Sequence, residues 1–254
     1  MGAGEEGVTL VVAAMEEEIA AFRGRLAEVV TVSVKNARVS VGRYRGTRVA
    51  LAVTGDGERN ARRGLAGVLA ALPVREVLVV GVAGALSPGL KVGDLVVCER
   101  VLAEDGLEVH AADERLVARF ARVPGCQRGL TVTARDVADS AARKQGLLGL
   151  AEATVGGTPL STVDLESAVF ATTAARAQLP WVVLRSVSDL ASEGLPPLLN
   201  ASRDDGGAIR RLRVVRGLLT QPSLLKSLLG LRDRVRACAD RLCEGIERAV
   251  GAEV

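Results

Sequence analysis

The stretch EVLVVGVAGA, residues 76–85, is a continuous apolar run that ends in small residues. A strand in the middle of a parallel sheet is covered on both faces, so it needs apolar side chains at successive positions rather than at alternate ones. We therefore predict a buried central strand over 76–82. The glycines and alanines of 81–85 predict a turn of small residues at the end of that strand.

Similar apolar runs recur along the chain and alternate with apolar residues at helical spacing. These patterns predict strands over 9–14, 92–102, 130–133 and 181–187, a hairpin over 38–54, and helices over 58–72 and 163–178. Strands that alternate with helices predict an α/β fold, here a three-layer αβα sandwich with a largely parallel, mixed central sheet. Ligands of such folds bind beyond the carboxyl ends of the strands, where Glu18 and Asp189 are expected to lie.

The composition favours a globular chain without a nucleic-acid partner. Hydrophobic residues make up 48% of the 254 residues and charged residues 25%, which is enough apolar material for a sizeable core. The formal net charge is only +3, and aromatic residues make up 2%. Because single-stranded nucleic acid is bound by basic grooves that stack bases on aromatic side chains, we expect no nucleic acid among the partners.

The four cysteines, at positions 98, 126, 238 and 243, form no Cys-x-x-Cys pair, and the chain has one histidine. These residues complete no plausible zinc set, so we predict no metal and no other cofactor, with the thiols reduced. The first apolar run is too short for a signal peptide or a membrane span. A cytoplasmic location is therefore expected.

The pattern changes after Pro196 and Pro197. Residues 198–254 contain no strand signal, and a basic, leucine-rich helical pattern runs from position 209 to position 250. We predict a catalytic domain over 1–195 and a helical extension over 196–254 that packs on or beside it. A basic amphipathic helix is also typical of proteins that touch an anionic membrane. The alternative is that it packs on the sheet or on a neighbouring subunit.

Clusters of chemically active residues occur in a characteristic order. They are 14–18 (AMEEE), 80–86 (VGVAGAL), 91–94 (KVGD), 163–166 (VDLE) and 185–189 (RSVSD). In this order, and with their strand and helix context, they resemble the nucleoside phosphorylase superfamily, especially its methylthioadenosine/S-adenosylhomocysteine nucleosidase branch. The resemblance covers about residues 8–195 and implies an enzyme that breaks the bond between a ribose and its base.

The resemblance implies two catalytic acids. Glu18 matches the glutamate that activates the attacking water, and Asp189 matches the acid that protonates N7 of the purine as it leaves. Ser188 is then close enough to orient Asp189. Each position also has an alternative interpretation: Glu18 as an acid in a first helical turn, Asp189 as a helix cap, and Ser188 as an ordinary serine at a strand end.

The same resemblance places the ribose at 164–166. Glu166 matches the acid that accepts hydrogen bonds from the ribose hydroxyls. Leu165 replaces the family's methionine and still covers the apolar face of the sugar, whereas Asp164 is one methylene shorter than the expected glutamate, so its role stays open. The alternative is that these acids merely begin a helix.

The segment formed by Gly81, Val82, Ala83 and Gly84 matches a family loop that holds phosphate or the nucleophilic water. Val82 occupies the position of a serine, which removes a hydroxyl donor, and the first strand lacks the Gly-Asp-Pro-x-Arg pattern with which phosphorylases hold phosphate. Both departures favour hydrolysis over phosphorolysis. Where known nucleosidases stack the base on an aromatic residue, this chain offers the apolar side chain of Val137.

The resemblance therefore implies a nucleosidase that releases adenine from an adenosine derivative. The alternatives are a phosphorolytic nucleoside phosphorylase, a futalosine-type hydrolase and an inactive nucleoside-binding module. The expected partners are a small-molecule nucleoside and a second copy of the chain in a homo-oligomer, most simply a dimer. The tail resembles hopanoid-associated members of the superfamily, which implies a lipid-linked substrate such as adenosylhopane and contact with the inner face of the membrane.

Overall fold

The computed structural model describes residues 7–35, 37–105, 108–202 and 224–251. The strands are β1 (Val8–Ala13), β2 (Ala27–Val34), β3 (Ala37–Tyr44), β4 (Thr47–Val53), β5 (Val74–Ala85), β6 (Leu95–Ala103), β7 (Glu108–Ala111), β8 (Cys126–Thr133), β9 (Ser161–Asp164) and β10 (Trp181–Asp189). The helices are the short 3-10 helix η1 (Glu16–Glu18), α1 (Ala20–Arg23), α2 (Glu58–Ala71), α3 (Glu114–Ala121), α4 (Ala141–Val155), α5 (Ser167–Arg176), α6 (Leu198–Ala201) and α8 (Leu224–Gly251).

The strands form one mixed sheet that is organised around β5. This strand pairs in parallel with β1 on one side and with β10 on the other, and its last residues pair antiparallel with β9. Strands β9, β8, β6 and β10 continue the pairing back to β5, so this half of the sheet closes on itself. The other half runs outward from β1 through β4 and β3 to β2 at the edge.

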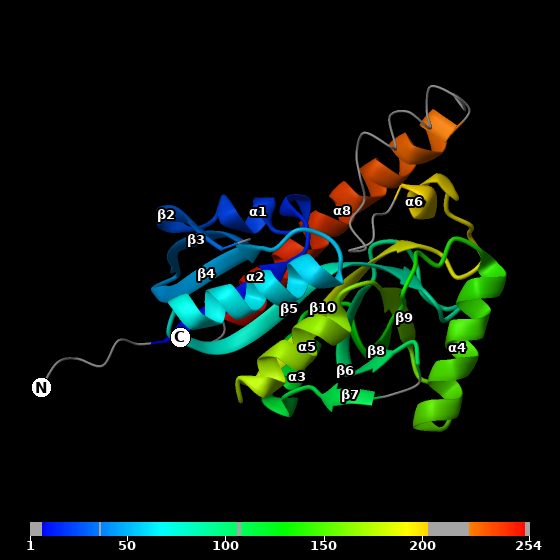
Figure 1. Ribbon diagram of the computed structural model, residues 1–254, viewed down its shortest axis with the longest axis horizontal. Helices are drawn as coiled ribbons and strands as arrows, with labels where there is room; N and C mark the ends of the chain where they lie inside the picture. The colour runs from blue at the N-terminus through cyan, green and yellow to red at the C-terminus, as the bar shows by residue number, and fades with distance from the viewer. Residues whose placement is uncertain (1–6, 36, 106–107, 203–223, 252–254) are drawn as a thin grey trace, which may run out of the picture.

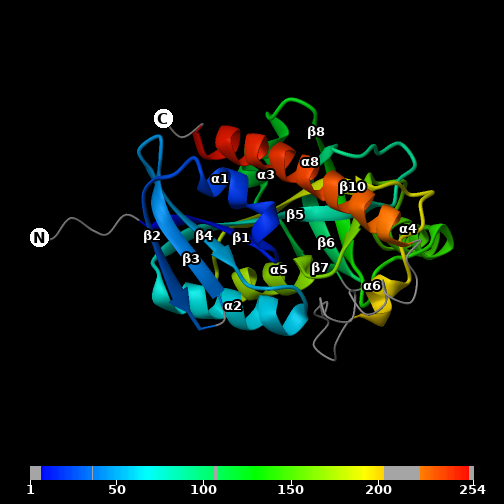
Figure 2. The ribbon, with the colours of Figure 1, turned by 90° about the horizontal axis from the view of Figure 1, so that it is seen from above.

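Helices cover both faces of the sheet. Helices α2 and α5 pack on one face through a core that includes Leu65, Val68 and Phe170, while α1, α3 and α8 pack on the opposite face around Phe22 and Phe120. Figure 2 shows these two layers with the sheet between them. Helix α4 lies against the closed half. The predicted α/β fold with a mixed central sheet between helices is confirmed.

The second half of α8 is an integral part of one core. Cys238, Leu242, Ile246 and Val250 are each fully buried, and the helix packs on β10, β5 and α1. The first half projects beyond the body of the molecule, as Figure 1 shows. The part of the predicted basic helix over 203–223 lies outside the described residues, and the domain boundary after position 195 stays a prediction.

One predicted element was wrong in type, and another began too early. The predicted turn over 81–85 continues β5 as strand, and the predicted helix over 163–178 starts with the last residues of β9, so the observed helix, α5, begins only at Ser167. The reason is tertiary: Gly84 and Ala85 pair with Val163 and Thr162 across the closed sheet. That pairing outweighs the local preference of small residues for a turn and of 163–166 for a helix.

A third departure lies near the N-terminus. The helical spacing of Ile19, Phe22 and Leu26 predicts a helix after the first strand, but the observed helix, α1, ends at Arg23 and the chain then forms β2. Seven of the eight positions of β2 are exposed, including Val30 at 63%. A strand without a buried face lacks the alternating pattern that would have revealed it.

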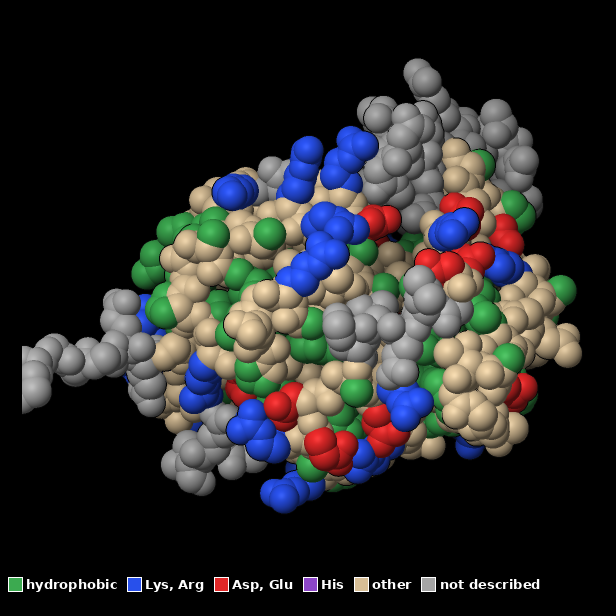
Figure 3. Space-filling model, turned by 60° about the horizontal axis from the view of Figure 1, so that its bottom comes forward, with side chains coloured by type: hydrophobic (Ala, Val, Ile, Leu, Met, Phe, Trp, Pro, Cys, Tyr) green, Lys and Arg blue, Asp and Glu red, His purple; other side chains and the backbone are tan. Residues whose placement is uncertain are grey.

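The described surface carries charges of both signs. On the face that Figure 3 shows, Lys and Arg side chains lie among Asp and Glu side chains, with hydrophobic side chains between them. None of the helices within the described ranges is long and apolar enough to cross a membrane.

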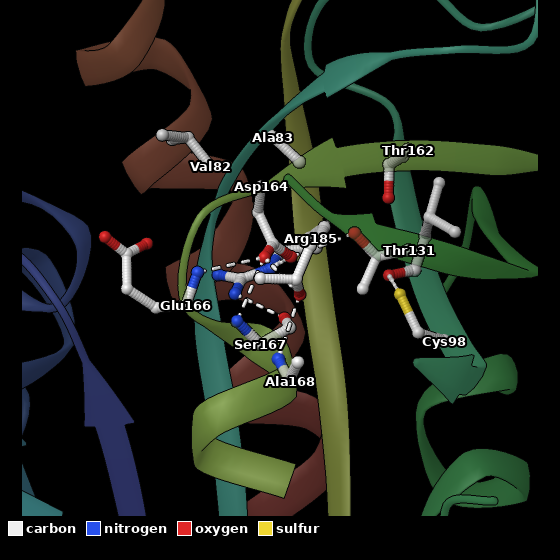
Figure 4. Close-up of polar contacts among 12 residues, drawn as sticks. Val82, Ala83, Cys98, Thr131, Thr162, Asp164, Glu166, Ser167, Ala168 and Arg185 are labelled. Carbon is white, nitrogen blue, oxygen red and sulfur yellow. Dashed lines mark hydrogen bonds and ion pairs between the residues drawn. The ribbon is translucent and has the colours of Figure 1, made fainter. Parts of the chain in front are cut away.

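A buried ion pair links β10 to β9 inside the closed half of the sheet. Arg185 and Asp164 are 4% and 7% exposed, and Nε of Arg185 donates to Oδ2 of Asp164 over 3.0 Å. A second guanidinium nitrogen, Nη2, donates to Oγ of Ser167 at the start of α5, over 2.6 Å. Thr131 and Thr133 of β8 donate to the two oxygens of Asp164. The pair and its hydrogen-bond partners therefore join three strands and a helix, and Figure 4 shows Arg185, Asp164 and Ser167 converging.

We predict that Arg185→Met lowers the free energy of unfolding by about 3–5 kcal/mol, because it leaves the buried carboxylate of Asp164 without its cation. The matched control is Arg128→Met. Arg128 also has two carboxylate partners, Glu99 and Glu114, but its side chain is 44% exposed, so a loss within about 1 kcal/mol is expected. Urea unfolding measures the free energy of unfolding of both variants. Equal losses in the two variants would contradict the stabilising role of the buried ion pair.

Candidate active site

A cleft of about 160 Å³ opens at the carboxyl ends of β1, β5, β9 and β10. Every residue proposed from the sequence for the site lines this cleft, except Gly81. The lining comprises Ala14, Met15, Glu18, Asp56, Val82, Ala83, Gly84, Val137, Ala138, Lys144, Val163, Asp164, Leu165, Glu166, Ser188, Asp189 and Leu195. Residues far apart in the sequence are thus brought to one cavity. In particular, Glu18 and Asp189 share it.

Glu18 is held rigidly at the end of η1. Its side chain is buried, and its two oxygens accept backbone hydrogen bonds, Oε1 from the Val82 amide and Oε2 from the Met15 amide, each over 2.9 Å. Burial raises the pKa of this carboxyl above its usual value, although Arg185 and the two amides act in the opposite direction. A carboxylate with a raised pKa is a better proton acceptor.

Gly81 contributes by lacking a side chain. A Cβ at this position would overlap Nη1 of Arg185 and lie 2.7 Å from Oε1 of Glu18. Gly84 likewise leaves room for the carboxylate of Asp189, because a Cβ at this position would lie 2.8 Å from Oδ2 of Asp189. Strand β5 therefore passes close to both acids, and the two glycines are separated by about 10 Å of strand.

Glu166 precedes α5 and projects away from the Arg185 cluster, as Figure 4 shows. Its Oε1 accepts a hydrogen bond of 2.9 Å from the Gly57 amide. Desolvation raises the pKa of this carboxyl to about 7, with a contribution from the negative charge of Asp164, while the Gly57 amide opposes the rise. A carboxylate on the cleft wall is a strong acceptor for hydroxyl donors.

Asp164 differs from Glu166 in that its oxygens are already occupied. Burial alone would raise its pKa, but Arg185 and the hydrogen bonds from Ser167 outweigh burial and hold the pKa below the usual value. Both oxygens accept hydrogen bonds from within the protein. In this structure Asp164 is the partner of Arg185, and its Oδ1 accepts hydrogen bonds from the amides of Glu166 and Ser167 at the start of α5.

Asp189 ends β10 and is 2% exposed. Its Oδ1 accepts a hydrogen bond of 2.6 Å from Oγ of Ser188, so the serine contacts the carboxyl group as expected. Its Oδ2 accepts a charged hydrogen bond from Nζ of Lys144, a residue of α4. No role had been expected for this lysine, and it is slightly more buried than Asp189 itself.

Apart from Asp56, the other described residues that line the cleft are apolar, and none of them is aromatic. Val82, Val137, Val163 and Leu165 contribute branched aliphatic surface. The backbone of Val137 is fixed by Asn200, which both accepts from its amide and donates to its carbonyl, each over 2.9 Å. The amide of Val82 is already used by Glu18. Within the described ranges, no group of three or more His, Cys, Asp or Glu residues is placed to hold a metal ion.

Sequence reasoning missed two charged residues of the site. Arg185 had a usable signal, because an arginine inside the run WVVLRSV is a charge in a buried strand, and such charges are paired. Lys144 had none. It occurs in the segment ARKQG beside another basic residue, and only the tertiary structure distinguishes it from an exposed lysine.

Solved structures share this architecture over nearly the whole chain. A 5′-methylthioadenosine/S-adenosylhomocysteine nucleosidase from Neisseria meningitidis, in complex with methylthio-immucillin-A, is 22% identical, with a TM-score of 0.74 and coverage of 97% of this chain and 100% of that chain. An S-adenosylhomocysteine nucleosidase from Streptococcus pyogenes is 18% identical, with a TM-score of 0.76 and full coverage of both chains. The futalosine hydrolase of Helicobacter pylori is 19% identical, with a TM-score of 0.75 and coverage of 97% and 98%.

At these identities the likeness shows the fold. The family is shown by a separate finding, because the family model described as the phosphorylase superfamily matches residues 9–211, most of the chain. The resemblance to this superfamily, stated from the sequence motifs, is thereby confirmed, whereas its nucleosidase branch and the hopanoid-associated character of the tail stay predictions. This chain belongs to the phosphorylase superfamily.

Proposed function

We propose that this protein is a nucleosidase that hydrolyses the N-glycosidic bond of an adenosine derivative and releases adenine. The observation that carries the proposal is the sharing of one cleft by Glu18, Glu166 and Asp189, which come from three separate segments. A base for water, an acceptor for sugar hydroxyls and an acid for the leaving group are the three functions that such a hydrolysis needs.

In the proposed mechanism, Glu166 binds the ribose hydroxyls and Leu165 covers the apolar face of the sugar. Asp189, oriented by Ser188, delivers a proton to N7, so that the base departs as a neutral molecule. Glu18 accepts a proton from the water that attacks the anomeric carbon. The raised pKa of Glu18 suits this task, and the bonds from Met15 and Val82 fix its orientation. Val137 and Val82 offer the base and sugar apolar contacts.

Hydrolysis is favoured over phosphorolysis by the polarity of the cleft. A phosphate site needs several donors, such as free amides and cationic side chains. Of the charged side chains that line the cleft, Lys144 is the cation, and its contacts are with Asp189 and backbone carbonyls. The Val82 amide is bonded to Glu18, and Val82 has no hydroxyl group. These contacts leave few donors for a phosphate ion.

The substrate class follows from family membership together with the site. The similar structures bear the names of methylthioadenosine/S-adenosylhomocysteine nucleosidases and of a futalosine hydrolase, which supports a purine nucleoside with a variable 5′ substituent. A futalosine-type substrate is therefore the second candidate. An inactive binding module is disfavoured, because a binder has no need of a buried base and a buried acid in one cleft.

We predict that Glu18→Gln and Asp189→Asn each lower adenine release by about a hundredfold or more, in line with typical contributions of general bases and acids. Release of base from methylthioadenosine, S-adenosylhomocysteine and futalosine, measured with and without phosphate, checks the prediction. Exposed Glu58→Gln is the control and is expected to leave the rate unchanged. Near-wild-type rates in both site variants would refute the assignment, and a requirement for phosphate would favour the phosphorolytic alternative.

We predict that nucleoside binding strengthens with pH through the range around 7, because Glu166 has a pKa of about 7 and accepts hydroxyl donors best when ionised. The dissociation constant of methylthioadenosine for the slow Asp189→Asn variant is expected to fall by about tenfold from pH 6 to pH 8. Calorimetry measures this dissociation constant at each pH. The control is the Asp189→Asn, Glu166→Gln double variant, whose affinity is expected to be weaker and flat over this range. A pH-dependent affinity in that double variant would assign the titration to another group.

We also propose that the enzyme works in the cytoplasm as a homo-oligomer, most simply a dimer, and that the first half of α8 contacts the inner face of the membrane when the substrate is lipid-linked, as adenosylhopane is. The support is positional: Leu229 is 49% exposed, Arg232 and Arg236 are exposed beside it, and this half of α8 extends beyond the body. Basic residues near exposed leucine favour an anionic lipid surface.

For this contact we predict that the protein co-sediments with vesicles containing anionic phosphatidylglycerol and less with purely zwitterionic vesicles. The Arg232→Glu, Arg236→Glu double variant is expected to lose most of the binding, since each basic residue contributes about 1 kcal/mol near such a surface. Arg62→Glu, on the exposed side of α2, is the matched control. Equal sedimentation of all three proteins would remove the membrane proposal and leave the nucleosidase proposal untouched.

A further inference from the structure

Lys144 is a buried cation that the proposed reaction has not used. It lies in the first turn of α4, whose N-cap is Ser140, and it is 1% exposed. Its ammonium group donates to three acceptors: Oδ2 of Asp189, the Leu190 carbonyl at 2.6 Å and the Glu193 carbonyl at 3.0 Å. A buried ammonium group is costly unless it is fully paired, so this arrangement requires every contact to persist.

The hydrogen bonds around Asp189 raise a question about the origin of the leaving-group proton. Oδ1 accepts from Ser188, and Oδ2 accepts from Lys144. A carboxyl group whose two oxygens both accept holds no proton of its own on those bonds. To protonate a purine, Asp189 must first receive a proton, and the ammonium group of Lys144 is the charged donor in contact with it.

We propose that Lys144 is the positioning residue that supplies this proton through Asp189; the inference rests on the nucleosidase function proposed above. As the glycosidic bond breaks, its electron pair goes to the base and N7 takes a proton from Asp189. Asp189 takes a proton from Nζ of Lys144, which becomes a neutral amine. Water gives hydroxide to the anomeric carbon and its other proton to Glu18. Solvent then restores the proton of Lys144 and removes that of Glu18, so charge and atoms balance.

The surroundings of Lys144 fit this role. Its two other acceptors are carbonyl groups, which do not ionise and therefore accept the amine in either protonation state. The nearby charged groups are Glu193, in the segment after β10, and Arg234, on α8. They pair with each other, Nη1 of Arg234 donating over 2.7 Å. Among the described residues, Asp189 is thus the carboxylate that the ammonium group of Lys144 contacts directly.

Two variants separate proton supply from a structural role. Lys144→Met removes the cation. Lys144→Arg keeps a cation that can hold Asp189, but a guanidinium group does not release its proton in proteins. Each is assayed with a purine nucleoside that the wild-type protein cleaves and with p-nitrophenyl β-riboside, whose leaving group departs as a stable anion and needs no acid. Both are also combined with Asp189→Asn.

The expected result is a loss of about a hundredfold or more in purine release for both variants, with p-nitrophenyl riboside cleavage within about threefold of wild type, because acid catalysis matters little for a good leaving group. The combined variants are expected to be no slower on the purine than Asp189→Asn alone. That pattern marks an effect exerted through the acid rather than on the fold.

Four results would overturn the inference. Three of them come from the single variants: wild-type purine release by Lys144→Met, purine release restored by Lys144→Arg, or equal losses on both substrates, which indicate a merely structural lysine. In the combined variants, further losses beyond that of Asp189→Asn would do the same. Failure of the proposed function is distinguishable from all of these, because the wild-type protein itself would then release no base from any nucleoside.

Discussion

The site depends on one buried guanidinium group. Three carboxyl groups, those of Glu18, Asp164 and Glu166, lie near Arg185. Its positive charge acts to lower the pKa of each of them. Their outcomes differ because their contacts differ. Asp164 touches the cation directly and stays a structural anion, whereas the pKa of the other two acids is raised by burial. Direct contact with this charge therefore distinguishes Asp164, whose pKa is lowered, from Glu18 and Glu166, whose pKa is raised by burial.

The second constraint is strand β5, which belongs to both halves of the sheet. Its length lets it pair with β1, β10 and β9 in turn, and this closes the sheet around the buried ion pair. The glycines at 81 and 84 allow side chains from neighbouring elements to approach its backbone on either side. The cleft residues Val82, Ala83 and Gly84 thus lie on a strand that is paired on both sides, which gives this wall of the cleft a fixed geometry.

Much of the fold could be predicted from the sequence, because continuous apolar runs such as 76–82 and 181–187 identify strands covered on both faces. The motifs around Glu18, Glu166 and Asp189 predicted which residues would meet in one cleft. The features that could not be predicted from the sequence have physical causes. The closure of the sheet depends on long-range pairing of 84–85 with 162–163, for which no local pattern exists. Lys144 resembles any surface lysine until α4 is packed, and the partners of Arg185 are 18 to 21 residues away in sequence.

The burial of the second half of α8 has a consequence for how the protein comes into being. Cys238 donates to the carbonyl of Val187, two residues before Asp189, and Leu242 and Ile246 complete the core beneath β1 and β5. The face of β1, β5 and β10 that α8 covers therefore lacks this part of its core until the ribosome has translated the codons for 238–250. A nascent chain that already carries every described residue of the cleft still lacks the helix that packs beneath it, so the cleft gains its full support only after 238–250 have been synthesised.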